Sequence, residues 1–320
     1  MRVSEIGEKR LIEIISSQFS KAEWVEVGIG DDSSAIKIGE ELLVITTDLI
    51  TKKTDIPREM TPFQIGLSLV AITLSDIAAM GAVPRGILIA MGIPKETELE
   101  YIQKICTGIE HACKKFSAPV LGGDISESDE LTLTGTAIGV TTKEEILLRK
   151  AIPGDNLIVT GEIGGAGAGL EILLRGISGY DHLIKRLLEP TPRIEEGIRI
   201  AKSKLARGCI DLSDSLSFAL KEMMDINRCG FEIYSDKLPV TKDVKVISEE
   251  INIDWRDLVV NTGGDFELLF TVPEENTEKV LELISSSCNA TVIGKAVADE
   301  KILLDGKEIV PRGFEHFFDK

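Results

Sequence analysis

The sequence has few aromatic side chains, few histidines and too little positive charge to balance its acids. Of its 320 residues, 5% are aromatic and three are histidines, and 53 Asp and Glu stand against 36 Lys and Arg. The net charge of −17 argues against nucleic acid or an anionic membrane as a partner, because both attract positive surfaces. It does not argue against ATP, because bound Mg²⁺ reverses the local charge.

Cysteine pairs, clustered histidines and long apolar runs are missing as well. The five cysteines form no Cys-x-x-Cys pair, which favours reduced thiols, and the histidines at 111, 182 and 316 are too scattered for a zinc site. The segment Met1–Arg10 has no apolar signal-peptide core, and no uninterrupted apolar run approaches the roughly 18 residues of a membrane span. The composition therefore predicts a soluble, cytoplasmic protein.

Two common nucleotide-binding motifs are also absent. There is no Gly-x-x-x-x-Gly-Lys-Ser/Thr segment, so this is not a P-loop enzyme. The glycine-rich stretch 161–169 follows a predicted strand and opens a predicted helix, but its spacing does not match the Gly-x-Gly-x-x-Gly motif of dinucleotide-binding domains. Close packing of that helix is the favoured interpretation, although its N-terminus could hold a phosphate.

What the sequence does have is aspartate, beside glycine, serine or threonine at the ends of apolar runs. The segments are Gly28-Ile29-Gly30-Asp31-Asp32, Thr46-Thr47-Asp48, Leu74-Ser75-Asp76, Gly122-Gly123-Asp124, Asp211-Leu212-Ser213-Asp214 and Gly263-Gly264-Asp265. A carboxylate placed where a strand gives way to a turn faces a cleft, and several together require a hard cation such as Mg²⁺ or Ca²⁺. Flanking glycines let a phosphate approach the backbone. The pattern predicts a metal–polyphosphate site.

Most of these aspartates also have an ordinary structural interpretation. Asp31 and Asp32 suit a turn, and Asp214 suits a helix N-cap. Asp76 is different, because it lies in the apolar run Leu69–Ala82, where a buried carboxylate needs a partner. Spacing alone does not assign the metal, and a calcium-stabilised structural protein stays open as an alternative.

The predicted elements form two mixed domains. Helical patterns cover 5–19, 61–80, 96–116, 166–174, a helix after Pro192, one from Ser215, and 275–285. Strand patterns cover 33–38, 41–47, 86–93, 120–121 (ending at Gly122-Gly123-Asp124), 131–140, 157–160, 209–212, 230–234, 268–272 and three short runs near 289–310. A Pro-Gly pair within Arg149–Asp155 predicts the boundary, giving domains 1–148 and 149–320 of α/β and α+β type.

From Val27 to Phe317 the chain resembles the thiamine-monophosphate kinase family, within the aminoimidazole ribonucleotide synthetase-like superfamily of ATP-binding proteins. The first five of the aspartate segments carry the resemblance, together with Ile77-Ala78-Ala79-Met80-Gly81-Ala82, Pro153-Gly154-Asp155, Glu267-Leu268-Leu269-Phe270-Thr271 and Gly313-Phe314-Glu315-His316-Phe317. The resemblance implies an N-terminal mixed sheet that forms a dimeric barrel with a second subunit, and a C-terminal α+β domain. Mg-ATP would lie between the two domains.

The resemblance further implies an activity and a set of residues. The family transfers the γ-phosphoryl group of ATP to thiamine monophosphate, giving thiamine diphosphate and ADP. The shell of several Mg²⁺ ions would comprise Asp32, Thr46, Thr47, Asp48, Asp76, Asp124, Asp211 and Asp214. The ATP contacts would be Gly123, Asp124, Arg149 and Ser213, with Asp48, Asp124 and Arg149 catalytic, and Phe314 would stack against the acceptor.

Three positions depart from the family's pattern. Thr54-Asp55 stands where a His-Phe pair is usual, and Ser215 stands where glycine is usual. The segment Gly264-Asp265-Phe266-Glu267 is one residue shorter than the usual Gly-Gly-Glu-Asp-Tyr-Glu. Because these departures lie near the acceptor side or the phosphate turn, we expect Asp55 and Asp265 to provide the acceptor contacts.

Phosphoryl transfer to a phosphate monoester needs little acid–base chemistry, because the acceptor oxygen is already largely ionised near neutral pH, so no general base is assigned.

A homodimer is expected to bury apolar strand residues, namely Ile36, Ile38, Leu42, Val44 and Ile45. Two alternatives remain: another enzyme of the superfamily (a cyclo-ligase or a maturation factor) and a non-catalytic nucleotide-binding regulator. Maturation factors of this type end in a reactive cysteine, whereas this chain ends Phe317-Phe318-Asp319-Lys320.

Overall fold

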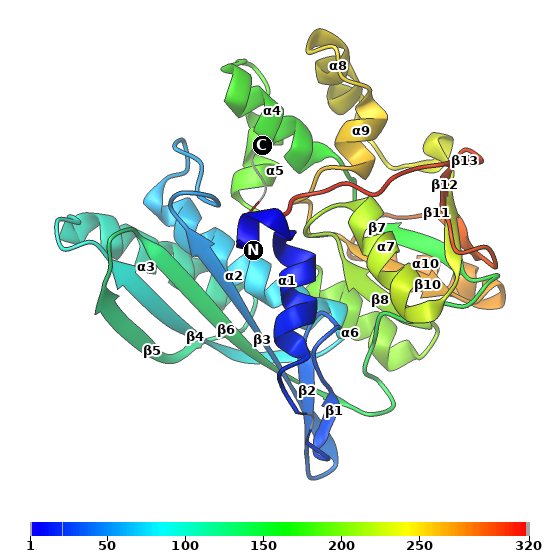
Figure 1. Ribbon diagram of the computed structural model, residues 1–320, viewed down its shortest axis with the longest axis horizontal. Coiled ribbons are helices and arrows are strands. Elements are labelled where there is room, and N and C mark those ends of the chain that lie inside the picture. The colour runs from blue at the N-terminus through cyan, green and yellow to red at the C-terminus, as the bar shows by residue number, and fades with distance from the viewer. Residues whose placement is uncertain (1, 21, 318–320) are drawn as a thin grey trace.

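The computed structural model describes residues 2–20 and 22–317, which form two sheets with helices packed around them (Figure 1). The terminal residues 318–320, on which the argument against a maturation factor depends, lie outside the described residues. The first sheet carries four of the eight predicted metal ligands, namely Thr46, Thr47, Asp48 and Asp124, and the second sheet lies beside it in the C-terminal half.

The first sheet has the strand order β1-β2-β3-β6-β4-β5. Its strands are β1 (Val25–Val27), β2 (Ser34–Ile38), β3 (Glu41–Thr51), β4 (Val83–Ile93), β5 (Val120–Glu127) and β6 (Thr132–Thr142). All neighbours pair antiparallel except β4 and β5, which are parallel and connected through the helix α3 (Leu99–Lys115). That crossover leaves β5 at the edge of the sheet.

The helix α2 (Pro62–Ala79) packs between this sheet and α3. Thr61 starts the helix, because its hydroxyl accepts a hydrogen bond of 3.3 Å from the backbone N–H of Gln64. The two helices approach closely at Gly66 and Gly108, where an added Cβ would lie 2.1 Å and 1.9 Å from backbone oxygens of the opposite helix. By length and composition α2 could cross a membrane, but 72% of its 18-residue window is buried inside the protein.

The second sheet has the strand order β13-β12-β9-β11-β7-β10-β8. Its strands are β7 (Asn156–Thr160), β8 (Gly208–Asp211), β9 (Gly230–Ile233), β10 (Leu268–Val272), β11 (Ala290–Val297), β12 (Ile302–Leu304) and β13 (Lys307–Glu308). The remaining helices are α1 (Gly7–Ser16), α4 (Gly165–Arg175), α5 (Asp181–Leu188), α6 (Ile194–Ser203), α7 (Leu216–Asn227), α8 (Lys242–Glu250), α9 (Trp255–Val260) and α10 (Thr277–Ile284). Short 3₁₀ turns cover Val3–Glu5, Ser235–Lys237 and Glu274–Asn276.

The central strands of the second sheet are buried on both faces. Leu269 packs into a core with α4, α7, α8 and α9, whereas Phe270 packs into a core with α6 and α10. Every residue of β10 is therefore buried, and buried and exposed side chains do not alternate along it. The second core also includes Ala78 and Ala79 of α2, and an added Cβ at Gly197 of α6 would lie 2.2 Å from the backbone oxygen of Ala78. The two halves of the chain therefore pack directly against each other along α2.

The two-domain arrangement with mixed sheets confirms the predicted fold class, but several details differ. Gly122, Gly123 and Asp124 lie inside β5 and not in a turn after it, because the parallel partner β4 continues the pairing to Glu127. Within the described residues neither sheet closes into a barrel. The boundary between 148 and 149 stays a prediction; it falls between the end of β6 and the start of β7.

The set of residues predicted for a dimer interface is partly wrong. Leu42 and Val44 are 2% and 0% exposed, because they point from β3 into the core under α2. Ile38 is exposed. The opposite face and the outer edge of the sheet carry exposed apolar residues at Leu49, Leu88, Leu121 and Ile125.

Candidate functional site

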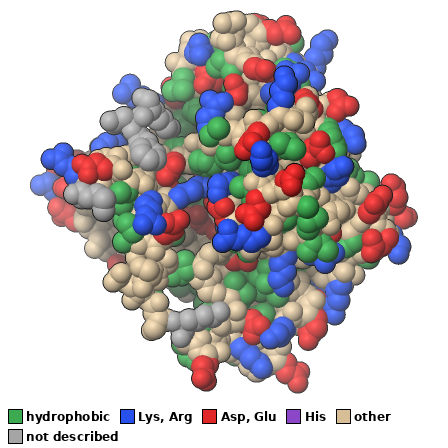
Figure 2. Space-filling model, turned by 45° about the vertical axis from the view of Figure 1, so that its right-hand side comes forward, with side chains coloured by type: hydrophobic (Ala, Val, Ile, Leu, Met, Phe, Trp, Pro, Cys, Tyr) green, Lys and Arg blue, Asp and Glu red, His purple; other side chains and the backbone are tan. Residues whose placement is uncertain are grey.

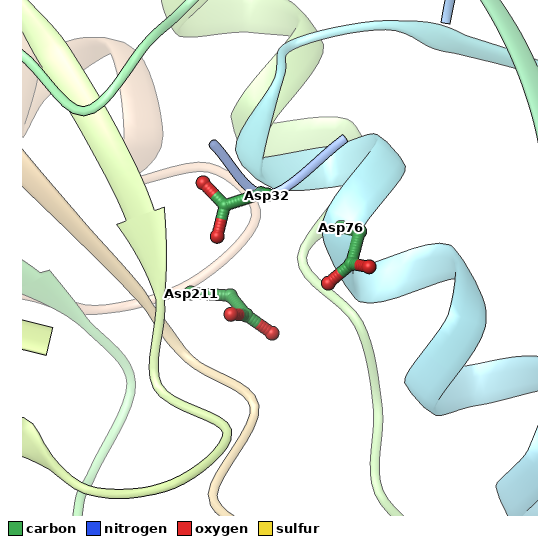
Figure 3. Close-up of side chains that lie close together, drawn as sticks. All are labelled: Asp32, Asp76 and Asp211. Carbon is green, nitrogen blue, oxygen red and sulfur yellow. The ribbon is translucent and has the colours of Figure 1, made fainter. Parts of the chain in front are cut away.

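Three carboxylates converge where the two halves of the chain meet. One oxygen from each of Asp32, Asp76 and Asp211 lies within 4.8 Å of the other two (Figure 3). Asp32 precedes β2, Asp76 lies in the second half of α2, and Asp211 ends β8. We refer to these three residues as the aspartate cluster.

Neighbouring hydroxyl groups hold two of the three carboxylates in place. Side chains alternate along β3, so Thr46 and Asp48 face α2 in the same way as the buried Val44. The hydroxyl of Thr46 donates a hydrogen bond of 2.5 Å to Asp76, and the hydroxyl of Ser75 donates one of 2.6 Å to Asp211. The cluster is thus built from the segment before β2, from α2 and from β8, and β3 supports it through Thr46.

Burial is the largest cause of the raised pKa values in and around the cluster. It raises the pKa of Asp211 to about 8 and that of Asp48 to about 6, and it raises the pKa of Asp76 well above its usual range. The charges of the neighbouring carboxylates raise the pKa of Asp76 further, because like charges oppose ionisation. In the folded protein the site therefore favours protonation of these carboxyls or the binding of a cation.

The oxygen atoms at the cluster fit a hard cation. Oδ2 of Asp32 and Oδ2 of Asp48 are buried and have no hydrogen-bond partner among the described residues. A buried carboxylate oxygen without a partner is costly, and a divalent cation with oxygen ligands satisfies it. Carboxylate and hydroxyl oxygens are the ligands that suit Mg²⁺ or Ca²⁺ rather than a thiolate-binding metal.

Arg149 lies beside the cluster in an ion-pair network. Its guanidinium group contacts Asp32 at 2.8 Å and Glu222 of α7 at 2.7 Å, and these carboxylates keep its pKa raised despite burial. Lys9 of α1 contacts the other oxygen of Glu222 at 2.8 Å. Arg149 is therefore a fixed positive charge next to the cluster.

Asp31 and Asp214 line this network. Burial, the first cause in both cases, raises the pKa of each carboxyl to about 6. The charges of Arg149 lower both pKa values, and Lys9 lowers that of Asp214, but neither effect outweighs burial. The site thus combines buried acids with two cations, an arrangement suited to phosphate groups and their counterions.

Asp124 and Gly123 do not join the cluster in this chain. One row of paired residues runs across the first sheet from β3 through β6 and β4 to β5. Its members are, in that order, Asp48, Gly135, Ile89 and Gly123. Three strand spacings separate the two ends of this row, roughly 14 Å. Asp124 belongs to the next row, with Ala90 and the exposed Leu49, and so lies on the sheet face away from α2.

The predicted metal ligand Thr47 and the predicted ATP contact Ser213 also make other contacts within the chain. The hydroxyl of Thr47 faces away from α2 and contacts that of Thr136 at 3.0 Å and the carbonyl oxygen of Gly135 at 3.2 Å. Ser213 lies in the turn before α7, and its carbonyl oxygen accepts a hydrogen bond of 2.7 Å from Gly264.

The predicted acceptor residues make different contacts. The carboxylate of Asp265 caps α4, accepting hydrogen bonds of 2.6 Å from Gly164 and 3.0 Å from Ala166. It thus occupies the helix N-terminus that could have held a phosphate. The backbone N–H of Phe314 donates a hydrogen bond of 3.3 Å to the carbonyl oxygen of Asp214, and His316 contacts both Asp55 and the ring of Phe314.

Sequence reasoning missed four residues at or near these sites. Ser75 directly precedes Asp76, so its burial could have been suspected from the apolar run around it. His316 lies in the segment Gly313–Phe317, which carries part of the family resemblance, but the resemblance implies no role for it. Glu222 and Lys9 carry no local signal, because only the packing of α1 and α7 brings them to Arg149.

The molecular surface mixes both signs of charge. Figure 2 shows Lys and Arg side chains interspersed with Asp and Glu over the coloured part of one face. The acidic side chains are therefore not gathered into one patch on this face, and three of them lie in the aspartate cluster.

Comparison with known proteins decides the family. Residues 30–141 match the N-terminal domain model of the AIR synthase related proteins, and residues 153–306 match the C-terminal domain model. The thiamine-monophosphate kinase of Aquifex aeolicus is 30% identical over 99% of this chain and 100% of its own length, and that of Methanocaldococcus jannaschii is 34% identical over 97% and 99%. The chain belongs to the thiamine-monophosphate kinase family.

A solved structure supports this assignment at the level of the fold. The structure described as AaThiL complexed with AMPPCP and TMP is 29% identical and has a TM-score of 0.89, covering 99% of both chains. The kinase fold therefore extends over almost the whole chain, including the segments that bring Asp32, Asp76 and Asp211 together.

Proposed function

We propose that this protein is a kinase that transfers the γ-phosphoryl group of ATP to thiamine monophosphate, giving thiamine diphosphate and ADP. The aspartate cluster, with its buried and unpartnered oxygens beside Arg149, is the observation that carries the proposal. Near full-length similarity to thiamine-monophosphate kinases, one of them solved with a nucleotide analogue and TMP, supports the choice of substrates.

Mg²⁺ is the cation that we assign to the cluster. Asp32, Asp76 and Asp211 would hold it, with Asp48 and Thr46 beside them. When bound, the ions would neutralise the phosphates of ATP and of the acceptor so that two anions can approach.

The protein's own residues orient the phosphates and hold the carboxylates. We assign Arg149 to the binding of phosphate oxygens; the ion pairs with Asp32 and Glu222, which hold its guanidinium group on two sides, support this role. Ser75 and Thr46 keep their carboxylate partners pointing into the site. Because the accepting phosphate oxygen is already largely ionised near neutral pH, no side chain is needed to remove a proton.

We further propose that the active enzyme is a homodimer that brings in Asp124 from a second copy. In its own chain Asp124 lies on the outer face of the first sheet, and every residue of β5 is exposed at the sheet edge. An unpaired edge strand with exposed apolar neighbours such as Leu88, Leu121 and Ile125 is a surface that a second copy can cover. Asp124 and Gly123 would then act on the ATP bound by the partner.

On the acceptor side, Asp265 and Phe314 remain our assignments as contacts, and Asp55 remains assigned to the same site. Phe314 offers a flat face that suits the aromatic rings of a thiamine phosphate. Asp265 is engaged by the N-terminus of α4 and would have to reach the acceptor from that position.

All five cysteines are free, which is consistent with the cytoplasmic location that we propose for the enzyme.

One assay separates the proposed function from its alternatives. Purified protein is incubated with ATP, Mg²⁺ and a panel of phosphorylated acceptors, and both ADP and the phosphorylated product are quantified. Thiamine monophosphate should give ADP and thiamine diphosphate in equal amounts. ADP without a diphosphate product would indicate another enzyme of the superfamily, and ATP binding without ADP would indicate a regulator.

A further inference from the structure

The C-terminal segment brings a histidine to the loop between β3 and α2. Nε2 of His316 lies 3.8 Å from Oδ1 of Asp55, which is too long for a hydrogen bond. The ring of His316 also meets the ring of Phe314 edge to face, with centroids 4.7 Å apart and an interplanar angle of 86°. A single imidazole therefore contacts two of the residues that the proposed function places at the acceptor.

The carboxylate of Asp55 is held by its own loop. Its Oδ2 atom accepts hydrogen bonds of 2.8 Å from the backbone N–H of Thr51 and 2.8 Å from the hydroxyl of Thr54. Its other oxygen faces the imidazole of His316. Asp55 is thus a rigid support for His316, which favours a positioning role over direct contact with a substrate.

The segment that carries His316 is anchored against α7 on one side. The hydroxyls of Ser215 and Ser217 donate hydrogen bonds of 2.7 Å and 2.8 Å to the carbonyl oxygen of Arg312. Gly313 leaves no room for a side chain, because an added Cβ would lie 2.5 Å from the ring of Phe218. Ser215, where the family usually has glycine, therefore fixes the start of this segment.

A second anchor comes from the N-terminal helix α1. The backbone N–H of His316 donates a hydrogen bond of 3.0 Å to Glu8, and the side chain of Glu315 accepts one of 3.4 Å from the backbone N–H of Lys9. Lys9 itself reaches Glu222, the partner of Arg149. The position of His316 is therefore tied through α1 to the ion-pair network beside the aspartate cluster.

The other two histidines of the chain lack this environment. His111 of α3 lies beside Phe63, with ring centroids 5.5 Å apart. His182 of α5 is paired with Asp243 of α8 at 2.9 Å and more than half of its side chain is exposed. His182 thus has an aspartate partner but no contact with the acceptor residues, which makes it a matched control.

We propose that His316 is an acceptor-binding residue and that Asp55 positions its imidazole. Asp55 occupies the Nε2 side of the ring, which leaves Nδ1 to exchange a hydrogen bond with the acceptor while Phe314 covers the acceptor's flat ring. The ligand class is a phosphate monoester that carries a flat heteroaromatic cation. This inference rests on the proposed function and assigns one more residue to its acceptor site.

The test combines kinetics with a spectroscopic measurement that needs no turnover. We would prepare His316→Ala, His316→Gln, Asp55→Asn, the double variant Asp55→Asn with His316→Ala, and His182→Ala as the control. The full-length proteins would be labelled with carbon-13 at histidine Cε1, so that only three ring signals need assignment. Thiamine monophosphate and related phosphate esters would be titrated into each protein without ATP.

We expect the ester to move the His316 signal and to leave the His182 signal unchanged. His316→Ala should raise the acceptor KM by about 10- to 100-fold and leave the ATP KM nearly unchanged, the scale of a lost hydrogen bond to a charged group. His316→Gln should restore part of the loss, because an amide can also form that bond. Asp55→Asn should move the His316 signal in the free protein, and the double variant should be no worse than His316→Ala.

Two results would overturn the inference. One is an unmoved His316 signal with every ester tested, and the other is a full additive loss in the double variant, which would give Asp55 a separate contact. Failure of the proposed function is a different result. A wild-type protein that forms no ADP but whose His316 signal responds to the ester would refute the kinase and support the role of His316.

Discussion

The hydroxyl of Ser75 donates a hydrogen bond of 2.6 Å to the carboxylate of Asp211, joining the second half of α2 to the end of β8. Both residues are buried. The bond links α2, the helix that packs against the first sheet, to β8 of the second sheet, at the point where the cation is proposed to bind. It fixes one ligand before any metal arrives, which is how a binding site is preorganised.

Replacing Ser75 by alanine should therefore weaken Mg²⁺ binding more than it weakens the fold. A hydrogen bond to a charged group contributes about 1.5–3 kcal/mol, so the Mg²⁺ concentration for half-maximal activity should rise by roughly 10- to 100-fold. Ser248→Ala is the matched control, because Ser248 is a buried helical serine that bonds only to the backbone of its own helix. Equal Mg²⁺ requirements in the two variants would contradict the role of Ser75.

Phe314→Ala should affect the acceptor and spare ATP. Stacking on an aromatic ring contributes about 1–3 kcal/mol, which corresponds to a loss of roughly 5- to 150-fold in kcat/KM for thiamine monophosphate. The ATP KM should stay close to that of the wild type. Phe19→Ala, which removes an exposed ring outside the site, is the comparison. Equal damage to both substrates' kinetics would place Phe314 outside the acceptor pocket.

Local patterns in the sequence predicted the fold better than they predicted the site. Thr61-Pro62 set the start of α2, and apolar runs gave both sheets, since these signals depend on neighbours in sequence. The helices α5, α8 and α9 were not predicted. They have eight, nine and six residues, so the helical pattern repeats only a few times in each; α10, which also has eight residues, lies within the longer predicted pattern 275–285.

The site depends on contacts between distant segments, which no local pattern contains. Asp76 could be singled out because a carboxylate in an apolar helix is unusual, and it does lie in the cluster. Thr47 and Asp124 were grouped with it by resemblance, but strand alternation and register place them on the other face of the sheet. The contact between Asp55 and His316 spans almost the whole chain and could not be read from either segment.

The metal-free protein should lose stability as pH rises. Burial raises the pKa of Asp211 to about 8 and that of Asp48 to about 6, from an ordinary value of 3.8. At a pH between the ordinary pKa of a carboxyl, 3.8, and its raised pKa, the folded protein holds a proton that the unfolded chain has released. The free energy of unfolding therefore falls with increasing pH in this range. Each carboxyl that stays protonated contributes up to about 1.4 kcal/mol per pH unit.

Calorimetry in EDTA, from about pH 5 to about pH 8, would measure this trend. Added Mg²⁺ should raise Tm most at the alkaline end, where it replaces the missing protons. Asp211→Asn should flatten the pH dependence and remove most of the response to Mg²⁺. A Tm in EDTA that rises steadily over this range would show that the carboxyls are ionised without cost.

The proposed dimer makes a prediction that a single chain cannot satisfy. Light scattering should give about twice the 34.9 kDa of one chain at micromolar concentration.

Asp48→Asn and Asp124→Asn should each lower turnover by about 10²–10³, because each removes a charge that acts on the phosphates or their cations. Asp129→Asn, an exposed aspartate in the turn after β5, is the control and should retain activity.

Mixing the two inactive variants then decides where Asp124 acts. If each site uses Asp48 of one copy and Asp124 of the other, a mixed dimer has one intact site and one site that lacks both carboxylates. Random reassociation makes half of the dimers mixed, so about a quarter of the wild-type activity should return. If Asp124 acts within its own chain, every site in the mixture lacks one carboxylate. Activity would then stay at the level of the separate variants, and the assignment of Asp124 to the partner's site would be wrong.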